Sequence, residues 1–183
     1  MLKNKKAYKI LIAGSFGSGK TTFVKTLSEI DPVLTEKKIS HPEDAPEGKD
    51  TTTVAMDMGK IKVTDDLEVH LFSAPGQARF SFMIDILQRG IIGAIILVDA
   101  TNPRSVKEAE ELAKYIYKNY EIPIVYAVTK LDKPNAKSLD EIKAYLEDDE
   151  SVKVVPLDPR DKKMSKKTLL ELLEMILRQD RSV

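Results

Sequence analysis

The chain has 183 residues, contains no cysteine, and balances 29 lysines and arginines against 29 aspartates and glutamates. This length suits one domain over 1–183 with a sizeable core, and the zero formal net charge argues against nucleic acid binding. Without cysteine, a membrane-length apolar stretch or a signal core, we expect a cytoplasmic protein that has no disulfides and no intrinsic membrane anchor.

The first predicted elements are a strand over 8–13 and an amphipathic helix over 22–30. Between them the sequence Gly-Ser-Phe-Gly-Ser-Gly-Lys-Thr has the pattern of a phosphate-binding loop. Its glycines let backbone N–H groups surround a phosphate, its lysine reaches the outer phosphates, and its threonine hydroxyl ligates Mg²⁺. The N-terminus of the helix completes this anion site. The predicted nucleotide-binding residues here are Gly14, Ser15, Phe16, Gly17, Ser18, Gly19, Lys20, Thr21 and Thr22.

Strand-like and helix-like segments alternate through the rest of the chain, after a segment over 31–50 that is rich in Pro, Glu and Lys and is expected to be a loop. This alternation predicts an α/β fold with a six-stranded, mostly parallel sheet, one antiparallel strand, and helices on both faces. A turn at 64–66 joins the second and third strands as a hairpin. The further predicted strands are 53–63, 67–72, 91–98, 124–128 and 152–155, and the further helices are 77–89, one opened by Asn102-Pro103, 138–146 and 166–178.

Ligands of such sheets bind outside the carboxyl ends of the strands, so polar residues that directly follow strands are candidates for the site. Besides the phosphate loop, three predicted strands end this way. The segments that follow them are 73–77, 129–132 and 157–160. We therefore expect these segments to meet the phosphate loop at one crevice.

Thr129-Lys130-Leu131-Asp132 resembles the guanine-recognition motif of small Ras-like GTPases. A carboxylate at Asp132 accepts hydrogen bonds from guanine N1–H and the N2 amine, a donor pair that adenine lacks. A site built on this group rejects the wrong base because the carboxylate would stay unpaired. The stem of Lys130 would lie over the base or the ribose.

A closer resemblance joins three segments, 14–24, 51–59 and 71–80, which look like the prokaryotic small GTPases of actinobacterial conservon operons, relatives of the MglA polarity GTPases. The resemblance implies a molecular switch that binds GTP, GDP and Mg²⁺ and hydrolyses GTP. It also implies roles for further residues. Thr53 would ligate Mg²⁺ together with Thr21, Gly76 would contact the γ-phosphate, Gln77 would orient the attacking water, and Lys20 would stabilise charge on the phosphates. Switch I would span about 31–58 and switch II about 73–89.

Three positions depart from the Ras-like pattern. Ser73 stands where an aspartate normally holds Mg²⁺ through water, and Phe16 stands where a glycine leaves room for an activator's arginine. We therefore expect slow intrinsic hydrolysis and an activator that repositions Gln77. The expected base contacts include Asp158 and Pro159, but Pro159 lacks the N–H that usually meets guanine O6. Either Arg160 or a neighbouring amide contacts O6 instead, or discrimination rests more heavily on Asp132.

Phe82 and Ile86 project away from the apolar stripe of their predicted helix, where they would either pack partly against a neighbouring helix or form a docking patch for a partner. The resemblance implies a small roadblock-type protein as that partner. Two other functions stay open. One is a nucleotide-binding module with negligible turnover. The other is a P-loop ATPase or kinase that uses Asp99 as its Walker B carboxylate. The charged fraction of 32% and the scarcity of side-chain amides favour a thermophilic source.

Overall fold

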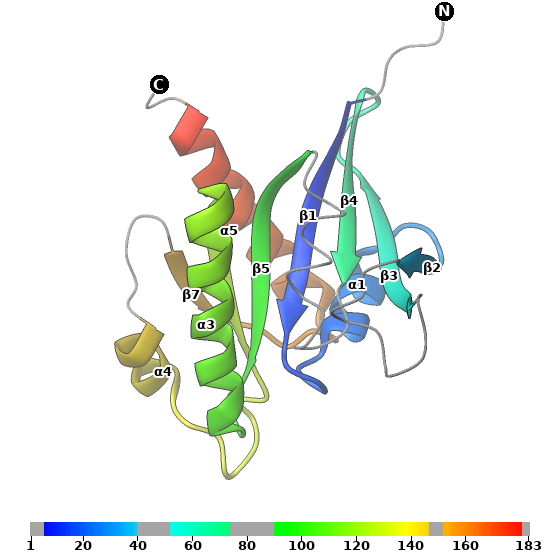
Figure 1. Ribbon diagram of the computed structural model, residues 1–183. Coiled ribbons are helices and arrows are strands. Elements are labelled where there is room, and N and C mark those ends of the chain that lie inside the picture. The colour runs from blue at the N-terminus through cyan, green and yellow to red at the C-terminus, as the bar shows by residue number, and fades with distance from the viewer. Residues whose placement is uncertain (1–5, 40–51, 74–89, 147–151, 181–183) are drawn as a thin grey trace, which may run out of the picture.

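The computed structural model describes residues 6–39, 52–73, 90–146 and 152–180 (Figure 1). These residues form a seven-stranded sheet in the order β2-β3-β4-β1-β5-β6-β7. The strands are β1 (Lys6–Gly14), β2 (Val33–Ile39), β3 (Thr52–Lys62), β4 (Leu67–Ser73), β5 (Ile91–Asp99), β6 (Ile124–Thr129) and β7 (Val152–Pro156). The helices are α1 (Lys20–Leu27), α3 (Pro103–Tyr120), α4 (Leu139–Leu146) and α5 (Lys162–Asp180).

The predicted α/β fold is confirmed. Strand β3 runs antiparallel to both of its neighbours, and the remaining neighbouring strands pair in parallel. The sheet therefore has the single reversed strand that the hairpin turn predicted. The helix expected over 77–89 lies outside the described residues.

Strand β2 corrects the sequence analysis, because it adds a seventh strand inside the segment that was expected to be a loop. It lies at the edge of the sheet, where it pairs with β3 alone. Its sequence, Val-Leu-Thr-Glu-Lys-Lys-Ile, carries charges that are common on edge strands and that break any apolar alternation. The free edge of β3, and not a pattern within the segment itself, accounts for the strand.

Two apolar cores lie on the two faces of the sheet, and the alternation of side chains along β1 divides its residues between them. Leu11 and Ala13 pack in the core beneath α3 and α4. Ile10 and Ile12 pack in the core beneath α1 and α5. Figure 1 shows α3 on one face of the sheet, with α1 and α5 on the other. Because both faces are buried, the parallel strands read as continuous apolar runs in the sequence.

Side-chain caps fix where two of the helices begin. The Asn102 side chain accepts the backbone N–H of Arg104 at 3.1 Å, which confirms the predicted start of α3. Asp161 accepts the backbone N–H of Met164 at 3.1 Å, so α5 begins a full turn before the predicted position 166. The early residues of α5 are mostly charged, and the apolar periodicity used for the prediction starts only after them.

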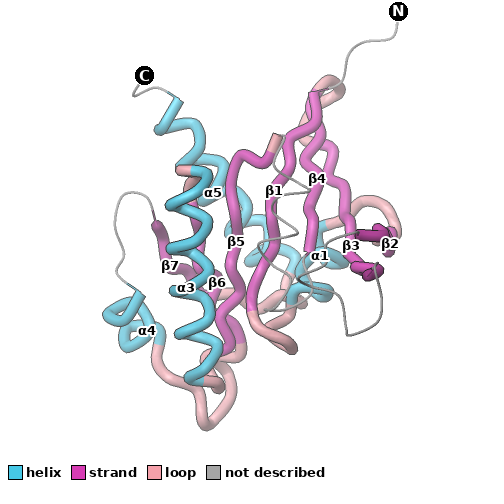
Figure 2. The backbone as a smooth tube through the Cα atoms, viewed as in Figure 1, coloured by secondary structure: helices cyan, strands magenta, loops and turns pink. Residues whose placement is uncertain are grey.

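The loops that follow β1 and β6 meet at one end of the sheet (Figure 2). This end carries the carboxyl termini of the parallel strands, where the sequence places the phosphate loop and the base motif. Within the described residues, no helix combines the length and the apolar character that a membrane span requires.

Candidate nucleotide-binding site

The phosphate loop between β1 and α1 depends on glycine at several positions. Gly14, Gly17 and Gly19 have φ of 137°, 74° and 106°, in the range that side-chain-bearing residues rarely adopt. At Gly14 a Cβ would also lie 2.3 Å from the carbonyl oxygen of Leu97, which is backbone of β5. The loop can therefore keep this path against β5 only with a glycine at its first position.

The Lys20 ammonium is held above this loop. Its Nζ donates to the carbonyl oxygens of Gly14 and Ser15 at 2.8 and 2.7 Å. Burial lowers the pKa of Lys20 to about 8, although the charges of Asp57 and Glu108 oppose the shift. A phosphate bound at this loop would give the buried ammonium an anionic partner in addition to these two neutral carbonyl oxygens.

Thr21 at the start of α1 contacts a carboxylate that the sequence analysis did not select. Its hydroxyl donates to Asp57 Oδ2 at 2.7 Å. Asp57 lies in β3 directly opposite Ser73 of β4. The carboxylate missing at Ser73 is thus present one strand away, beside the threonine expected to ligate Mg²⁺.

The signal that could have located Asp57 is the register of the hairpin. The turn at 64–66 pairs Lys62 with Glu68, and counting five residues outward along each strand reaches Asp57 and Ser73. The Ras-like pattern at position 73 does not contain this register, because the register depends on the partner strand.

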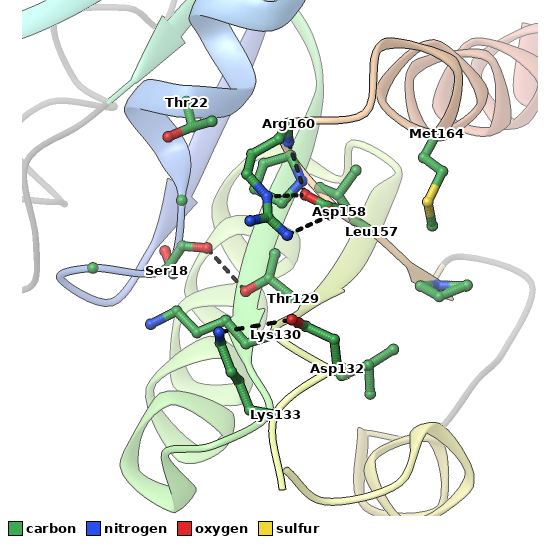
Figure 3. Close-up of a pocket in the computed structure, with 15 residues that line it drawn as sticks. Ser18, Thr22, Thr129, Lys130, Asp132, Lys133, Leu157, Asp158, Arg160 and Met164 are labelled. Carbon is green, nitrogen blue, oxygen red and sulfur yellow. Dashed lines mark hydrogen bonds and ion pairs between the residues drawn. The ribbon is translucent and has the colours of Figure 1, made fainter. Parts of the chain in front are cut away.

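A pocket of about 440 Å³ lies between the phosphate loop and the loops that follow β6 and β7 (Figure 3). The buried Thr129 joins two of its walls, since its hydroxyl donates to the carbonyl oxygen of Ser18 at 2.9 Å. Ser18 also lines the pocket, and its buried hydroxyl has no hydrogen-bond partner among the described residues. Asp132 lies on the lower side of the pocket in this view, with Lys133 Nζ 3.7 Å from its carboxylate.

Lys130 is fixed by Asp99. Its Nζ lies 2.5 Å from Asp99 Oδ2, and Thr101 donates to the other carboxylate oxygen through both its N–H and its hydroxyl. Burial alone would raise the pKa of Asp99, but the hydrogen bonds from Lys130 and Thr101 outweigh it and hold the pKa below its usual value. Lys130 also adopts φ of 60°, a left-handed conformation that is uncommon for residues other than glycine.

The loop after β7 closes the pocket from the other side. Pro159 packs so closely against the phosphate loop that a Cβ on Gly19 would lie 2.9 Å from the proline ring. The Pro159 carbonyl also accepts a hydrogen bond from the Thr26 hydroxyl at 2.7 Å. Arg160 forms a two-point ion pair with Asp158, with distances of 2.9 Å from Nε to Oδ1 and 2.8 Å from Nη2 to Oδ2.

Most of the predicted phosphate and base residues therefore lie around one crevice. Gly17, Ser18, Gly19, Thr22, Thr129, Lys130, Asp132, Asp158 and Pro159 line the pocket itself. Phe16 projects from the phosphate loop and is 95% exposed. The backbone of Thr53 lies in β3 opposite Lys38, four residues before Asp57. Gly76, Gln77, Phe82 and Ile86 lie outside the described residues.

The fold, the phosphate loop and this pocket define a nucleotide-binding protein of the P-loop, GTPase-like class. Residues 30–181 match the family model described as "conserved hypothetical ATP binding protein", and the chain belongs to this family. The match begins after the phosphate loop, so the loop itself is evidence independent of it.

Three proteins are similar to this chain in sequence. An uncharacterized protein of Methanocaldococcus jannaschii is 32% identical over 124 residues, which are 68% of this chain and 70% of that protein. Elongation factor 4 of Thermotoga maritima is 27% identical over 135 residues, 69% of this chain and 21% of that protein. The mouse (Mus musculus) Ras-related protein Rab-7b is 27% identical over 141 residues, 73% of this chain and 64% of that protein.

Proposed function

We propose that this single-domain chain is a cytoplasmic switch protein that binds GTP and GDP with Mg²⁺ and hydrolyses GTP. The observation that carries the proposal is the junction of phosphate loop and base loop through Thr129 and Ser18. Because this hydrogen bond fixes the two loops to one another, a nucleotide that reaches both meets a preformed site. A Ras-related protein is among the relatives, which supports GTP as the nucleotide.

The phosphates would lie against the loop between β1 and α1. Backbone N–H groups of the loop and of the first turn of α1 would bind them there, and the helix dipole favours an anion at this end of α1. The Lys20 ammonium is already held at the loop by two carbonyl oxygens and needs little rearrangement to meet the outer phosphates.

The donor set beside the phosphate loop fits Mg²⁺. This ion takes oxygen ligands and is commonly held by one or two carboxylates together with substrate phosphates. Thr21 would ligate it through its hydroxyl, and Asp57 would hold it directly or through water. When bound, Mg²⁺ neutralises charge on the β- and γ-phosphates. A role for Thr53 requires the start of β3 to leave the sheet, because four residues of strand span about 13 Å.

The hydrolysis step would be an in-line attack of water on the γ-phosphorus. The new P–O bond forms as the bond to the β,γ-bridging oxygen breaks, giving GDP and inorganic phosphate. Gln77 would orient the water and the Gly76 N–H would contact the γ-phosphate, both by resemblance to small GTPases. Lys20 would stabilise charge on the phosphoryl oxygens. Phe16, which is exposed, would occupy the place where a glycine leaves room for an activator's arginine, and this favours an activator that repositions Gln77.

Switching would follow from contacts that only the γ-phosphate and Mg²⁺ make with switch I, about 31–58, and switch II, about 73–89. Resemblance to the MglA-related GTPases suggests a roadblock-type partner that docks through Phe82 and Ile86. Such a partner would distinguish the GTP-bound from the GDP-bound protein by the position of switch II.

A P-loop ATPase or kinase built on Asp99 is disfavoured by the contacts of that carboxylate. Asp99 accepts hydrogen bonds from Lys130 and Thr101, whereas the Thr21 hydroxyl beside the phosphate loop donates to Asp57. The carboxylate of Asp99 therefore serves the base side of the site.

A single-turnover assay of phosphate release tests hydrolysis. Wild type loaded with GTP and Mg²⁺ should release phosphate slowly, and Gln77→Leu should release it at least about tenfold more slowly. The matched control is Gln179→Leu, which removes an exposed side-chain amide near the end of α5, away from the predicted site. Absence of release from wild type would support instead a binding module with negligible turnover.

A further inference from the structure

The pocket carries opposite charges on two sides. Figure 3 shows Asp132, from the loop after β6, on the side of Lys130 and Lys133, and Arg160, from the loop after β7, across the pocket from it. Asp158 raises the pKa of Arg160 most strongly, and the charge of Asp132 contributes to the same shift. A ligand between them would meet an acceptor on one side and a donor on the other.

Arg160 is held in place by its neighbour. Asp158 takes both the Nε and the Nη2 of the guanidinium, and its Oδ1 also accepts the backbone N–H of Arg160 at 3.0 Å. These contacts lower the pKa of Asp158 to about 2, so the pair stays ionised at neutral pH. The planar guanidinium therefore has one edge occupied, and the N–H groups of Nη1 remain for a ligand.

Three other donor positions near this side of the pocket are already engaged or missing. The Thr129 hydroxyl donates to the Ser18 carbonyl, Pro159 has no N–H, and the backbone N–H of Arg160 is taken by Asp158. In the loop after β7, the guanidinium is thus the strongest donor that lines the pocket.

We propose that Arg160 is a specificity-determining residue that donates to the O6 and N7 edge of a guanine base whose N1 and N2 edge meets Asp132. The inference rests on the proposed function and deepens it. Arginine is the side chain that most often pairs with guanine O6 and N7, because its planar donors match these two acceptors.

The same arrangement rejects adenine at both edges. Adenine presents an acceptor at N1 to the Asp132 carboxylate and a donor at N6 to the Arg160 guanidinium. At Asp132 two acceptors would face each other and the carboxylate would stay without its hydrogen bonds, and at Arg160 the N6 amine would oppose the guanidinium, so that N7 alone could still accept from it. Arg160 therefore adds a second discrimination to the one that Asp132 supplies.

The test compares GDP with 7-deaza-GDP, in which a C–H replaces N7, by calorimetric titration of the full chain with Mg²⁺. Wild type should bind 7-deaza-GDP about tenfold more weakly than GDP. Arg160→Met should bind GDP about tenfold more weakly than wild type and should no longer distinguish the two ligands. Arg178→Met, at the far end of α5, is the matched control and should behave as wild type.

Two results would overturn the inference while leaving the proposed function intact. One is tight binding of GDP by wild type without any preference over 7-deaza-GDP, which requires no variant to fold. The other is an Arg160→Met protein that melts like wild type and keeps the full preference. If wild type binds no GDP at all, the proposed function itself is wrong.

Discussion

Asp57 of β3 lies directly opposite Ser73 of β4, and its carboxylate accepts the hydroxyl of Thr21 at 2.7 Å. Ser73 occupies the place where the Ras-like pattern has an aspartate, so the antiparallel partner strand restores a carboxylate next to the phosphate loop. This pairing gives the proposed Mg²⁺ site an acidic group without the usual motif.

Asp57→Asn should weaken Mg²⁺-dependent nucleotide binding. Removal of a carboxylate that orients a metal or its water commonly lowers metal affinity about 10–100-fold. Titration of Mg²⁺ into the GDP complex measures the change, and the exposed Asp140→Asn in α4 controls for the loss of one negative charge. Because the two positions face each other, Ser73→Asp in the Asp57→Asn background should recover part of the affinity. Equal Mg²⁺ affinity in wild type and Asp57→Asn would contradict the assignment.

Asp132→Asn should change which base is bound. The amide cannot accept from both N1–H and the N2 amine, so GDP affinity should fall by about a hundredfold or more. Xanthosine diphosphate, which has an oxygen at position 2, should gain affinity because the amide can donate to it. Calorimetric titration of both nucleotides checks this prediction. An Asp132→Asn protein that binds GDP as wild type does would remove Asp132 from the base site.

Nucleotide binding should draw a proton onto Lys20. Burial lowers its pKa from 10.5 to about 8, and bound phosphates would raise it again. Near pH 8 about half of the lysine is neutral before binding, so uptake should approach half a proton per nucleotide. Calorimetry in buffers of different ionisation enthalpy measures this uptake.

The sign of the effect also applies to folding. The pKa of Lys20 is lower in the folded than in the unfolded chain, so burial of the charged ammonium lowers the free energy of unfolding at neutral pH. This loss of stability becomes smaller as the pH rises from about 8 toward 10.5. Lys20→Arg stays charged across this range and should show no proton uptake. Uptake that is the same in wild type and Lys20→Arg would assign the proton to another group.

Thr129→Val should separate stability from binding. It removes the hydroxyl that joins the base loop to the Ser18 carbonyl, and we expect a loss of about 1–2 kcal/mol in unfolding free energy. Thr168→Val in α5 is a matched control, because its buried hydroxyl bonds to Met164 within one helix. The midpoint temperature of thermal unfolding should fall in both variants, but GDP affinity should fall only in Thr129→Val. A parallel loss of affinity in both variants would deny the junction a role in binding.

The strands and the phosphate loop were predictable because their signals are local. Burial on both faces makes β1, β5 and β6 continuous apolar runs, and Asn102 followed by Pro103 marks the start of α3. The edge strand β2 was not predictable from its own residues, since pairing with β3 decides its structure.

The site divides in the same way. Residues within a motif could be proposed from the sequence, Lys20 from the phosphate-loop pattern and Thr129 and Asp132 from the resemblance to the guanine-recognition motif. The contact of Asp57 with Thr21 could be predicted only by counting the register of the hairpin. The contact of Asp99 with Lys130 joins the ends of two strands that are distant in sequence. Asp99 was singled out for a Walker B role, and its contacts with Lys130 and Thr101 place it instead behind the base loop.

The central claim is that the pocket between the phosphate loop and Asp132 holds a guanine nucleotide, in a family described as ATP binding. Calorimetric titration of the nucleotide-free chain with GDP and with ADP, both with Mg²⁺, tests it most directly. We expect GDP to bind at least about a hundredfold more tightly than ADP. ADP binding as tight as that of GDP, or tighter, would contradict it.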